Sequence, residues 1–389
     1  MQVTRFDVII VGGGLAGLAL ACALRDTRLK IALVEQRPPR PVPGWDARVY
    51  AVSPANADFL QTIGIWKHLP AERMAPISAM KVVGDGGARL DFSAYAAGLP
   101  ELGWILESSL MACELWENVK RQSNVTLLCP ATPAKLEMGT ASALLTLTDG
   151  RTLAASLLVG ADGRDSWTRT ALGLRAHVTA YDEMGVVANF ECQTPHRGIA
   201  RQWFRRDGVL AWLPLAGNRI SIVWSTPDEN ARALLALPAE ELCSRVAAAG
   251  ECELGPFTLL TPATAFPLRL VRVPQIVAPR LALLGDAAHG IHPLSGHGIN
   301  LGYQDARTLA ELLAARPEWQ DIGSERLLKA YQRQRREETL LMQATTHALH
   351  HLFQQDFPGF RTLRNLGMNL TNALPVVKNM LVRYATGAF

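Results

Sequence analysis

The first part of the chain alternates short apolar runs with turns and a segment of small residues. Residues 6–11 form a short, mostly apolar run that leads into glycines, residues 15–25 have the composition of a helix, and residues 30–34 form a second such run that Glu35 closes. Short apolar runs of this kind are typical of strands buried on both faces of a parallel sheet. We therefore expect a strand–helix–strand unit at the start of the fold.

Proline and serine positions predict the next loop and helices. Four prolines within residues 36–47 exclude regular structure there. Ser53 can cap a helix that runs to residue 63. Ser108 or Ser109 can cap a longer helix that runs to about residue 121.

The middle of the chain changes to short segments in which polar and apolar residues alternate. A strand is predicted at residues 125–129, and a hairpin at 143–159 turns at Asp149-Gly150. From about 175 to 267 the alternation predicts an antiparallel sheet. The predicted strands of this sheet are 185–191, 199–204, 209–213 and 220–224. Such a block inside an α/β chain indicates an inserted domain that faces the substrate.

The last part of the chain is predicted to be mostly helical. A core strand at 280–284 precedes helices at about 299–315 and 324–352, and Pro375 interrupts a helix in the tail. The fold class we expect is α/β. It combines a Rossmann-like dinucleotide-binding domain with an inserted antiparallel β-sheet domain and a helical C-terminus.

The composition fits a globular protein and excludes several classes. The chain has 389 residues, of which 49% are hydrophobic and 19% charged, and its net charge is +4; we expect no nucleic-acid partner. The six cysteines form no CxxC pair, which argues against zinc and disulfides and favours a cytoplasmic protein. Residues 8–24 carry no charge, but four glycines interrupt this run. We therefore expect a strand and a helix there instead of a signal peptide.

A glycine-rich motif follows the first predicted strand. Gly12, Gly14 and Gly17 fit the GxGxxG pattern directly before a helix, and Glu35 ends the second strand. The first glycine permits a tight turn, the second lets a pyrophosphate approach the backbone, and the third allows the helix to contact the strand. A carboxylate at the position of Glu35 can bind ribose hydroxyls. Together these features predict a dinucleotide site.

Two further motifs place an aspartate among small residues at a strand end. Asp162 lies in Gly-Ala-Asp-Gly, and Asp286 lies in Gly-Asp-Ala-Ala-His. Either motif alone could be a capped turn. A loop over residues 291–302 then provides glycines before a helix, where free backbone N–H groups and the positive end of the helix dipole favour a negatively charged ligand.

These motifs, in this order and spacing, resemble those of the group A flavoprotein monooxygenases, the FAD aromatic hydroxylases of the para-hydroxybenzoate hydroxylase type. Within that group the chain is most similar to the ubiquinone-biosynthesis hydroxylases. The segments that carry the likeness are 46–53, 64–66, 212–215, 266–268 and 285–305. The likeness extends over nearly the whole chain.

The resemblance implies FAD as the cofactor and assigns roles by position. The ADP half of FAD would be held by Gly12, Gly14, Gly17 and Glu35. The isoalloxazine ring would be lined by Pro293, Gly296, Gly298, Ile299 and Asn300. The resemblance identifies no catalytic residue beyond the flavin.

Three further positions carry roles by resemblance. Arg48 would lie beside the cofactor, and Asp286 would bind the ribityl–pyrophosphate region. Asp162 matches a motif that serves both FAD and the incoming nicotinamide nucleotide. The chain departs from the pattern at His297, where the subfamily usually has glutamine, and at Glu107, where many relatives have arginine or glutamine.

The implied reaction is the hydroxylation of an aromatic ring through a flavin C4a-hydroperoxide formed from O₂. The chain has one GxGxxG motif, so NAD(P)H would visit transiently as the reductant, or another protein would supply the electrons. The substrate we expect is a polyprenylated phenol or quinol on the route to ubiquinone. A hydroxylase of a small soluble phenol and a non-catalytic flavin-binding accessory protein of a quinone-biosynthesis complex remain alternatives.

The resemblance also implies a division of the chain into domains. The FAD-binding domain would comprise residues 1–73, 102–174 and 268–353, and the substrate domain residues 74–101 and 175–267. The C-terminal helical tail would be 354–389.

A few polar residues outside the motifs are weak candidates. His347, His350 and His351 have helical spacing, but no carboxylate accompanies them and we expect no metal site. Asp305 and Arg307 are expected to form an ordinary polar face of a helix.

The tail combines basic and apolar residues. Residues 357–389 contain no acidic residue, and their four basic residues are Arg361, Arg364, Lys378 and Arg383. This segment is either a helix packed on the FAD domain or an interfacial segment that contacts anionic lipids. The second possibility would make the protein peripheral on the inner membrane, where other ubiquinone-biosynthesis proteins could be partners.

Overall fold

The predicted strand–helix–strand unit lies at the centre of a parallel sheet. The structure is a computed structural model that describes residues 3–291, 298–354 and 358–386. In it, β8, β2, β1, β11 and β19 lie side by side in this order and run parallel. The strands of this sheet are β1 (Val3–Val11), β2 (Ile31–Val34), β8 (Val125–Leu128), β9 (Pro133–Met138), β10 (Ala143–Leu147), β11 (Thr152–Gly160), β18 (Val277–Ala278) and β19 (Leu281–Leu283). The predicted hairpin is the antiparallel pair β10 and β11.

The second sheet contains the predicted antiparallel strands. Its order is β20-β17-β12-β15-β14-β13-β5-β6, with β16 paired to β12, and its pairs are antiparallel except for β13 with β5. Its strands are β5 (Ala79–Val83), β6 (Arg89–Ser93), β12 (His177–Cys192), β13 (Ile199–Arg205), β14 (Gly208–Leu215), β15 (Arg219–Pro227), β16 (Phe257–Leu259), β17 (Thr264–Arg272) and β20 (His289–Gly290). The predicted domain boundary between residues 267 and 268 falls within β17.

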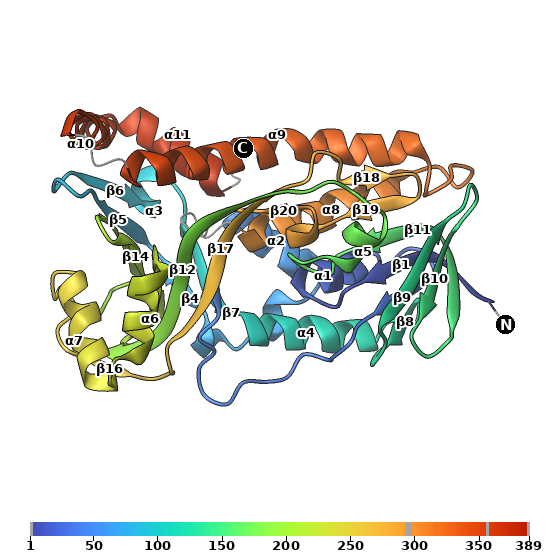
Figure 1. The fold of residues 1–389 in the computed structure, drawn as a ribbon, viewed down its shortest axis with the longest axis horizontal. Helices are drawn as coiled ribbons and strands as arrows, with labels where there is room; N and C mark the ends of the chain where they lie inside the picture. Colours follow the sequence, from blue (N-terminus) through green and yellow to red (C-terminus); the bar gives the residue numbers. More distant parts are fainter. Residues whose placement is uncertain (1–2, 292–297, 355–357, 387–389) are drawn as a thin grey trace.

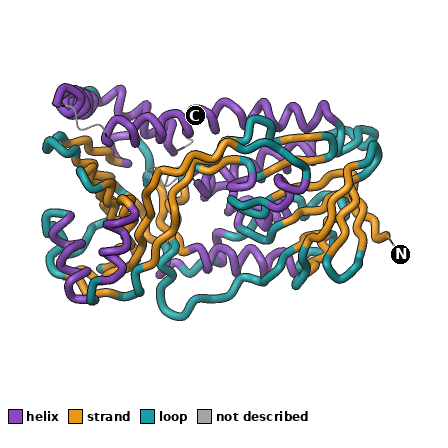
Figure 2. The backbone as a smooth tube through the Cα atoms, viewed as in Figure 1, coloured by secondary structure: helices purple, strands orange, loops and turns teal. Residues whose placement is uncertain are grey.

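A small third sheet lies between the two large ones. It has the order β3-β7-β4, formed by β3 (Val49–Val52), β4 (Ala75–Ile77) and β7 (Gly103–Glu107). The strands of the two large sheets gather toward opposite ends of the molecule (Figure 2). The third sheet therefore connects the region of the sequence motifs with the inserted sheet.

Helices cover the sheets and build two hydrophobic cores. The helices up to α7 are α1 (Leu15–Ala23), α2 (Pro54–Thr62), α3 (Ala94–Ala97), α4 (Ser108–Lys120), α5 (Trp167–Ala171), α6 (Asp228–Ala236) and α7 (Ala239–Ala249). Short 3-10 turns occur at Trp66–His68, Ala71–Arg73 and Gly285–Ala287. One core packs α1, α2, α4 and α8 (Gly298–Ala315) around the first sheet, and the other packs α6 and α7 against buried Trp212 and Trp224.

The C-terminal helices extend over the second sheet. α9 (Glu325–Gln354) runs along one long side of the molecule, and α10 (Pro358–Ala373) and α11 (Pro375–Thr386) lie over β5 and β6 (Figure 1). The predicted break at Pro375 is confirmed. The tail packs on both predicted domains, because α10 contacts β6 of the second sheet and α9, most of which lies in the predicted FAD-binding segment 268–353. Within the described residues, no helix combines the length and apolar character needed to cross a bilayer.

The start of α4 corrects a second expectation. Its N-cap is Glu107, and Ser108 is already helical. The Glu107 side chain does not cap the helix; instead its carboxylate accepts hydrogen bonds from Arg73 and from the backbone of Asp46. The sequence rule favoured serine because its hydroxyl is a common cap, but the helix starts where β7 ends.

Candidate functional site

The three motifs meet at one edge of the first sheet. β1, β11 and β19 are parallel neighbours, and they lead into Gly12, Ala161 and Leu284 respectively. The carboxyl ends of parallel strands lie at the same edge, which is where α/β sheets bind ligands. The sequence could predict this meeting because each motif directly follows a buried strand.

Two glycines of the first motif are required by close packing. Gly12 has a φ of +108°, and a Cβ there would lie 2.4 Å from the carbonyl oxygen of Ala161. A Cβ on Gly17 would lie 2.1 Å from the carbonyl oxygen of Gly12. Both positions therefore exclude a side chain and bring α1 against the strand ends.

Gly14 differs because the space beside it is open. It is the N-cap of α1, no side chain caps this helix, and the nearest atom to an added Cβ is the Ala161 oxygen at 4.0 Å. Gly14, Leu15 and Ala16 line a large cavity. The N-terminus of α1 thus presents backbone N–H groups and a positive dipole to that cavity, an arrangement that suits a phosphate.

Glu35 supports the loop from behind. Its Oε2 accepts a hydrogen bond from the Gly13 N–H at 2.5 Å, and its Oε1 accepts one from the Arg37 N–H at 2.9 Å. Glu35 lies beside the glycine loop and is not among the described residues that line the cavity. The predicted ribose contact remains a prediction.

Asp162 and Asp286 have different surroundings. The carboxylate of Asp162 accepts hydrogen bonds from the Ser166 hydroxyl at 2.5 Å and the Thr168 N–H at 2.8 Å, so it organises the turn into α5. Asp286 lines the cavity, its side chain is 38% exposed, and Arg164 lies 3.7 Å away. Of the two aspartates, Asp286 is therefore the one available to a ligand.

Two arginines near these motifs were not predicted. Arg164 lines the cavity, and the buried Arg169 donates hydrogen bonds to the carbonyl oxygens of Ala287 and Arg164 at 2.9 and 2.8 Å. Arg169 thereby ties the Asp162 turn to the Asp286 turn. The signal in the sequence was a basic residue directly after the Gly-Ala-Asp-Gly motif.

Asn300 joins the start of α8 to the third sheet. Its Oδ1 accepts a hydrogen bond from the Ser53 N–H at 2.9 Å, and its Nδ2 donates one to the Ala51 carbonyl at 2.8 Å. Gly298, Ile299 and Asn300 line the cavity. Pro293, Gly296 and His297 lie outside the described residues.

Asp305 is not part of an ordinary polar face, and that expectation was wrong. It is fully buried, and its carboxylate accepts hydrogen bonds from the Gly285 N–H at 2.9 Å, His289 Nε2 at 2.7 Å and Arg335 Nε at 2.8 Å. Its neighbour Arg307 is exposed and pairs with Glu311, as a polar face would. The partners of Asp305 come from distant segments, so helical periodicity alone did not reveal them.

The charged groups of this network stabilise one another's ionised forms. Burial alone would lower the pKa of His289, but the Asp305 carboxylate outweighs burial and raises it. Burial would raise the pKa of Asp305, but His289 and Arg335 outweigh this and lower it. The network fixes the Gly285 turn, and with it the position of Asp286.

The loop before β3 is fixed by a second buried ion pair. Arg73 donates hydrogen bonds to both Glu107 oxygens at 2.8 and 2.7 Å and lies 3.9 Å over the Trp45 ring. Glu107 also accepts from the Asp46 N–H at 2.7 Å, and Asp46 in turn accepts from the Arg48 N–H at 2.9 Å. The unusual glutamate thus holds the loop that carries Arg48, which lines the cavity.

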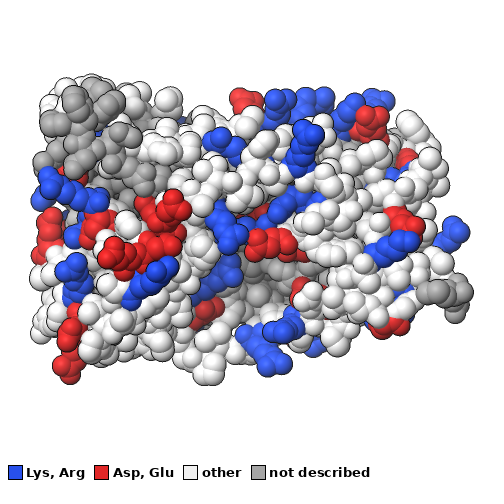
Figure 3. Space-filling view, viewed as in Figure 1, with Lys and Arg blue, Asp and Glu red and all other residues white. Residues whose placement is uncertain are grey.

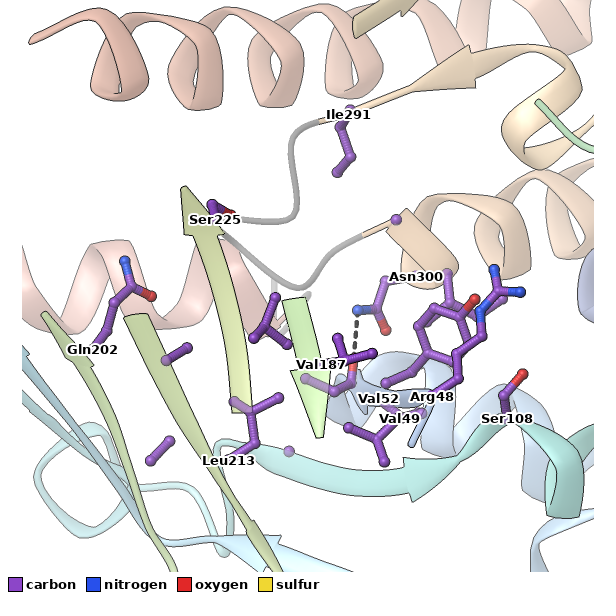
Figure 4. A pocket seen from close by; sticks show the side chains of 18 of the residues that line it. Arg48, Val49, Val52, Ser108, Val187, Gln202, Leu213, Ser225, Ile291 and Asn300 are labelled. Carbon is purple, nitrogen blue, oxygen red and sulfur yellow. Dashed lines mark hydrogen bonds between the residues drawn. The ribbon is translucent and has the colours of Figure 1, made fainter. Parts of the chain in front are cut away.

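Several of these groups border one cavity of about 2380 Å³, and the others fix the turns and loops that carry them. Its walls include Gly14, Arg48, Asp286 and Asn300 at the motif end, and the inner face of the second sheet (Figure 4). It continues to Met380 and Leu381 on α11. Single ligand pockets are usually about 300–1,000 Å³, so this cavity has room for a large cofactor together with a second molecule.

Comparisons with known proteins agree on the family. A family described as FAD binding domain matches residues 5–345. Ubiquinone hydroxylase UbiL of Rhodospirillum rubrum is 37% identical over 98% of this chain and 89% of its own length. The 3-demethoxyubiquinol 3-hydroxylase of Escherichia coli is 32% identical over 98% of both chains. This chain belongs to the FAD-dependent monooxygenases of the ubiquinone-hydroxylase family.

Solved structures agree on the fold. PqsL of Pseudomonas aeruginosa, in complex with 2-aminobenzoylacetate, has a TM-score of 0.79 at 23% identity and covers 94% of this chain and 99% of its own. The p-nitrophenol 4-monooxygenase PnpA of Pseudomonas putida has a TM-score of 0.78 at 18% identity, covering 98% and 97%. With the family match and the two relatives above, the enzyme is a flavoprotein monooxygenase with FAD as its cofactor, as the resemblance implied.

The residues present fit FAD. The open side of Gly14 and the uncapped N-terminus of α1 face the cavity that also contains Asp286. Bound FAD supplies the reactivity toward oxygen in this family of monooxygenases. The protein supplies a phosphate site, a fixed Asp286 turn and an apolar chamber that excludes water from the reacting centre.

Charged and histidine side chains also lie outside this site within the described segments. In the segments that the structure describes, no three His, Cys, Asp or Glu side chains gather as a metal site. His347 Nδ1 lies 3.3 Å from the Tyr181 hydroxyl, and its ring packs on His351. Basic and acidic side chains are mixed over the face shown in Figure 3.

Proposed function

We propose that this monooxygenase hydroxylates the ring of a polyprenylated ubiquinone precursor at a membrane surface, with O₂ as co-substrate. The observation that carries the proposal is the course of the cavity. It begins at Gly14 and Asp286 and continues to Met380 and Leu381, which both line it and are 58% and 42% exposed. A ring beside the flavin could therefore extend an apolar chain toward the outer face of α11.

We assign the cofactor as the motifs and the cavity suggest. Gly12, Gly14 and Gly17 would form the phosphate site, with Glu35 toward the ribose. Asp286 would bind the ribityl–pyrophosphate region, Arg48 would lie beside the cofactor, and the Asp162 motif would serve both FAD and the incoming nicotinamide nucleotide. The ring would be lined by Gly298, Ile299, Asn300 and the undescribed Pro293 and Gly296. NAD(P)H, the typical reductant of this family, would visit transiently, because the chain carries one GxGxxG motif.

The substrate class follows from the relatives and from the apolar wall. Two of the relatives are named ubiquinone hydroxylase and 3-demethoxyubiquinol 3-hydroxylase. The cavity wall toward the C-terminal helices includes Val82, Leu90, Phe92, Phe204 and Phe353. These side chains suit a hydrocarbon chain better than a polar ligand.

We also propose that α10 and α11 rest on the inner membrane as part of a cytoplasmic, peripheral enzyme. Both helices expose large apolar side chains, namely Leu366, Leu370, Leu374, Val376, Val377, Met380 and Leu381. Exposed apolar clusters on helices mark interaction or membrane surfaces. Other ubiquinone-biosynthesis proteins could bind the same region.

The structure changes the expected role of the basic tail residues. Arg364 is 5% exposed, pairs with Asp85 and donates a hydrogen bond to the Leu352 carbonyl at 2.9 Å. It therefore holds α10 in place and is withdrawn from lipid. Arg383 is exposed and remains available to lipid. Because Arg364 is withdrawn, the apolar side chains would contribute more to membrane binding than the charged ones.

Complementation of a ubiquinone-deficient strain tests the function, with quinone intermediates profiled by mass spectrometry. We expect restored ubiquinone from the parent chain and none from Gly14→Val or Asp286→Ala. Restoration by both variants despite loss of FAD would indicate an accessory role. Absence of restoration, together with turnover of a small phenol, would indicate the soluble-phenol hydroxylase.

A further inference from the structure

Two polar side chains interrupt an otherwise apolar stretch of the cavity wall. Gln202 on β13 and Ser225 on β15 line the cavity and are 6% and 3% exposed. Figure 4 shows both on strands of the second sheet, with Gln202 on the opposite side of the view from Arg48 and Ser225 nearer the middle. The apolar neighbours on this face are Val187, Phe204, Val209, Ala211, Leu213 and Val223.

Among the residues that the structure describes, neither polar side chain has a hydrogen-bond partner. In the described structure, the Gln202 carboxamide and the Ser225 hydroxyl make no hydrogen bond to another residue. Buried polar groups in native proteins are nearly always paired, and a carboxamide offers two donors and an acceptor. Two unpaired groups more than nine-tenths buried and facing one cavity therefore indicate a ligand with polar atoms at this place.

The strand register places Gln202 three strands away from Val187, and Ser225 on the strand next to that of Val187, paired with Gly185. Gln202 pairs with Ala211, Ala211 with Val223, and Val223 with Val187. Three strand spacings put the Gln202 Cα about 14 Å from that of Val187. Val187 and Asn300 both line the cavity. An aromatic ring between Asn300 and the far strands would present its far substituents to Gln202 and a nearer one to Ser225.

We propose that Gln202 and Ser225 bind the oxygen substituents of the aromatic substrate and so determine its specificity. The Gln202 amide would donate to a ring oxygen or accept from a ring hydroxyl, and the Ser225 hydroxyl would do the same on the neighbouring side. The site selects rings that carry hydroxyl, methoxy or carbonyl oxygen. This inference deepens the proposed function and rests on it for the position of the ring.

Ligand pairs that differ by one oxygen test the proposal. The FAD-loaded enzyme is titrated with 2-geranylphenol and geranylbenzene, and with 4-methylphenol and toluene, while the flavin absorbance is followed. The variants are Gln202→Met, Gln202→Leu and Ser225→Ala. The matched control is Ser221→Ala, which removes a fully buried, unpaired hydroxyl on the same strand and lies outside the described cavity wall.

We expect the parent to bind each phenol more tightly than its hydrocarbon. The ratio of phenol to hydrocarbon affinity should fall about two- to tenfold in the Gln202 or Ser225 variants, because each variant loses one hydrogen bond to the ligand. The ratio should be unchanged in Ser221→Ala. Melting temperature and FAD content report folding, and removal of an unpaired polar group should not lower either.

Other outcomes would separate the two proposals. Equal weakening of phenol and hydrocarbon, or an unchanged preference in all Gln202 and Ser225 variants, would overturn the inference. A parent enzyme with no phenol preference would also overturn it. If the small pair follows the expected pattern while neither geranyl ligand binds, Gln202 and Ser225 keep their role and the polyprenylated substrate is wrong.

Discussion

At the residue scale, the glycines of the GxGxxG motif differ in the space around them. Gly12 and Gly17 have no room for a side chain because the Ala161 and Gly12 carbonyls lie against them, whereas Gly14 faces open cavity. The first two are therefore required by packing, whereas Gly14 leaves the space beside the helix N-terminus open to a ligand. This difference makes Gly14 the position where folding and cofactor binding can be separated.

Gly14→Val should therefore remove FAD while the protein still folds. The valine side chain would occupy the space through which a pyrophosphate approaches the helix N-terminus. Flavin absorbance of the purified variant, with its circular dichroism spectrum as the folding control, checks this. Retention of stoichiometric FAD would show that this loop does not hold the cofactor.

Two aspartates near the Gly285 turn should respond differently to substitution. Asp286→Ala should weaken FAD binding about tenfold or more, the range for a hydrogen bond to a charged group, with little change in apo-protein melting temperature because the side chain is 38% exposed. Asp305→Asn should instead reduce the free energy of unfolding by about 3–5 kcal/mol, because it leaves buried charges unpaired. Equal losses of stability in the two variants would contradict these assignments.

The raised pKa of His289 predicts a pH-dependent contribution to stability. A histidine whose folded-state pKa exceeds its unfolded value of about 6.5 stabilises the fold fully below that pH. The contribution is lost as pH rises through the folded-state pKa. Urea unfolding between pH 6 and pH 9 should show the advantage of the parent over His289→Gln shrinking with rising pH. A constant difference would mean that the imidazole stays neutral.

At the scale of elements, α10 completes the exposed edge of the second sheet. Asn365, Asn369 and Asn372 accept hydrogen bonds from the backbone N–H groups of Ala88, Arg89 and Asp91 respectively, at 3.1–3.3 Å. Their spacing of four and three residues puts them on one helix face. The asparagines thereby satisfy edge-strand donors that would otherwise be open to another chain.

The exposed apolar side chains of this helix predict membrane binding. Leu366 and Leu370 are 63% and 59% exposed, and each should contribute about 1–2 kcal/mol when buried in lipid. Leu366→Gln with Leu370→Gln should therefore reduce co-sedimentation with anionic liposomes. Leu235→Gln is the matched control, because Leu235 is 39% exposed on α6. If the double variant binds as the control does, α10 is a structural cover alone.

Charge should play a smaller part in the same assay. Arg383→Gln should lower binding to anionic vesicles by about 1 kcal/mol, and added salt should have a similar effect. Arg364→Gln should instead lower the melting temperature, because Arg364 pairs with the largely buried side chain of Asp85 in the turn between β5 and β6. Salt-independent binding would assign the interaction to the apolar side chains.

The elements show which features of the fold could be predicted from local sequence patterns. The strands around the glycine motif and the break at Pro375 were predictable because each depends on adjacent residues. The Asp305 network was not, since its partners lie 16, 20 and 30 residues away. The docking of Arg364 on Asp85 spans 279 residues, so the basic tail looked freer in sequence than it is in the fold.

At the scale of the whole molecule, one cavity joins three regions of the chain. The first sheet supplies the strand ends, the second sheet supplies the wall with Gln202 and Ser225, and α9 to α11 close the far side. This arrangement can exclude water from a flavin while leaving an apolar exit for a chain. Neither sheet alone provides both functions.

The incorporation of labelled oxygen tests this account most directly. Purified FAD-loaded enzyme is given NADH or NADPH, ¹⁸O₂ and a phenol that carries a geranyl chain, and the products are analysed by mass spectrometry. We predict one ¹⁸O atom on the aromatic ring of the prenylated product, and no product from Gly14→Val. Consumption of reductant that yields only hydrogen peroxide with the prenylated phenol, while an unprenylated phenol gains ¹⁸O, would contradict the account.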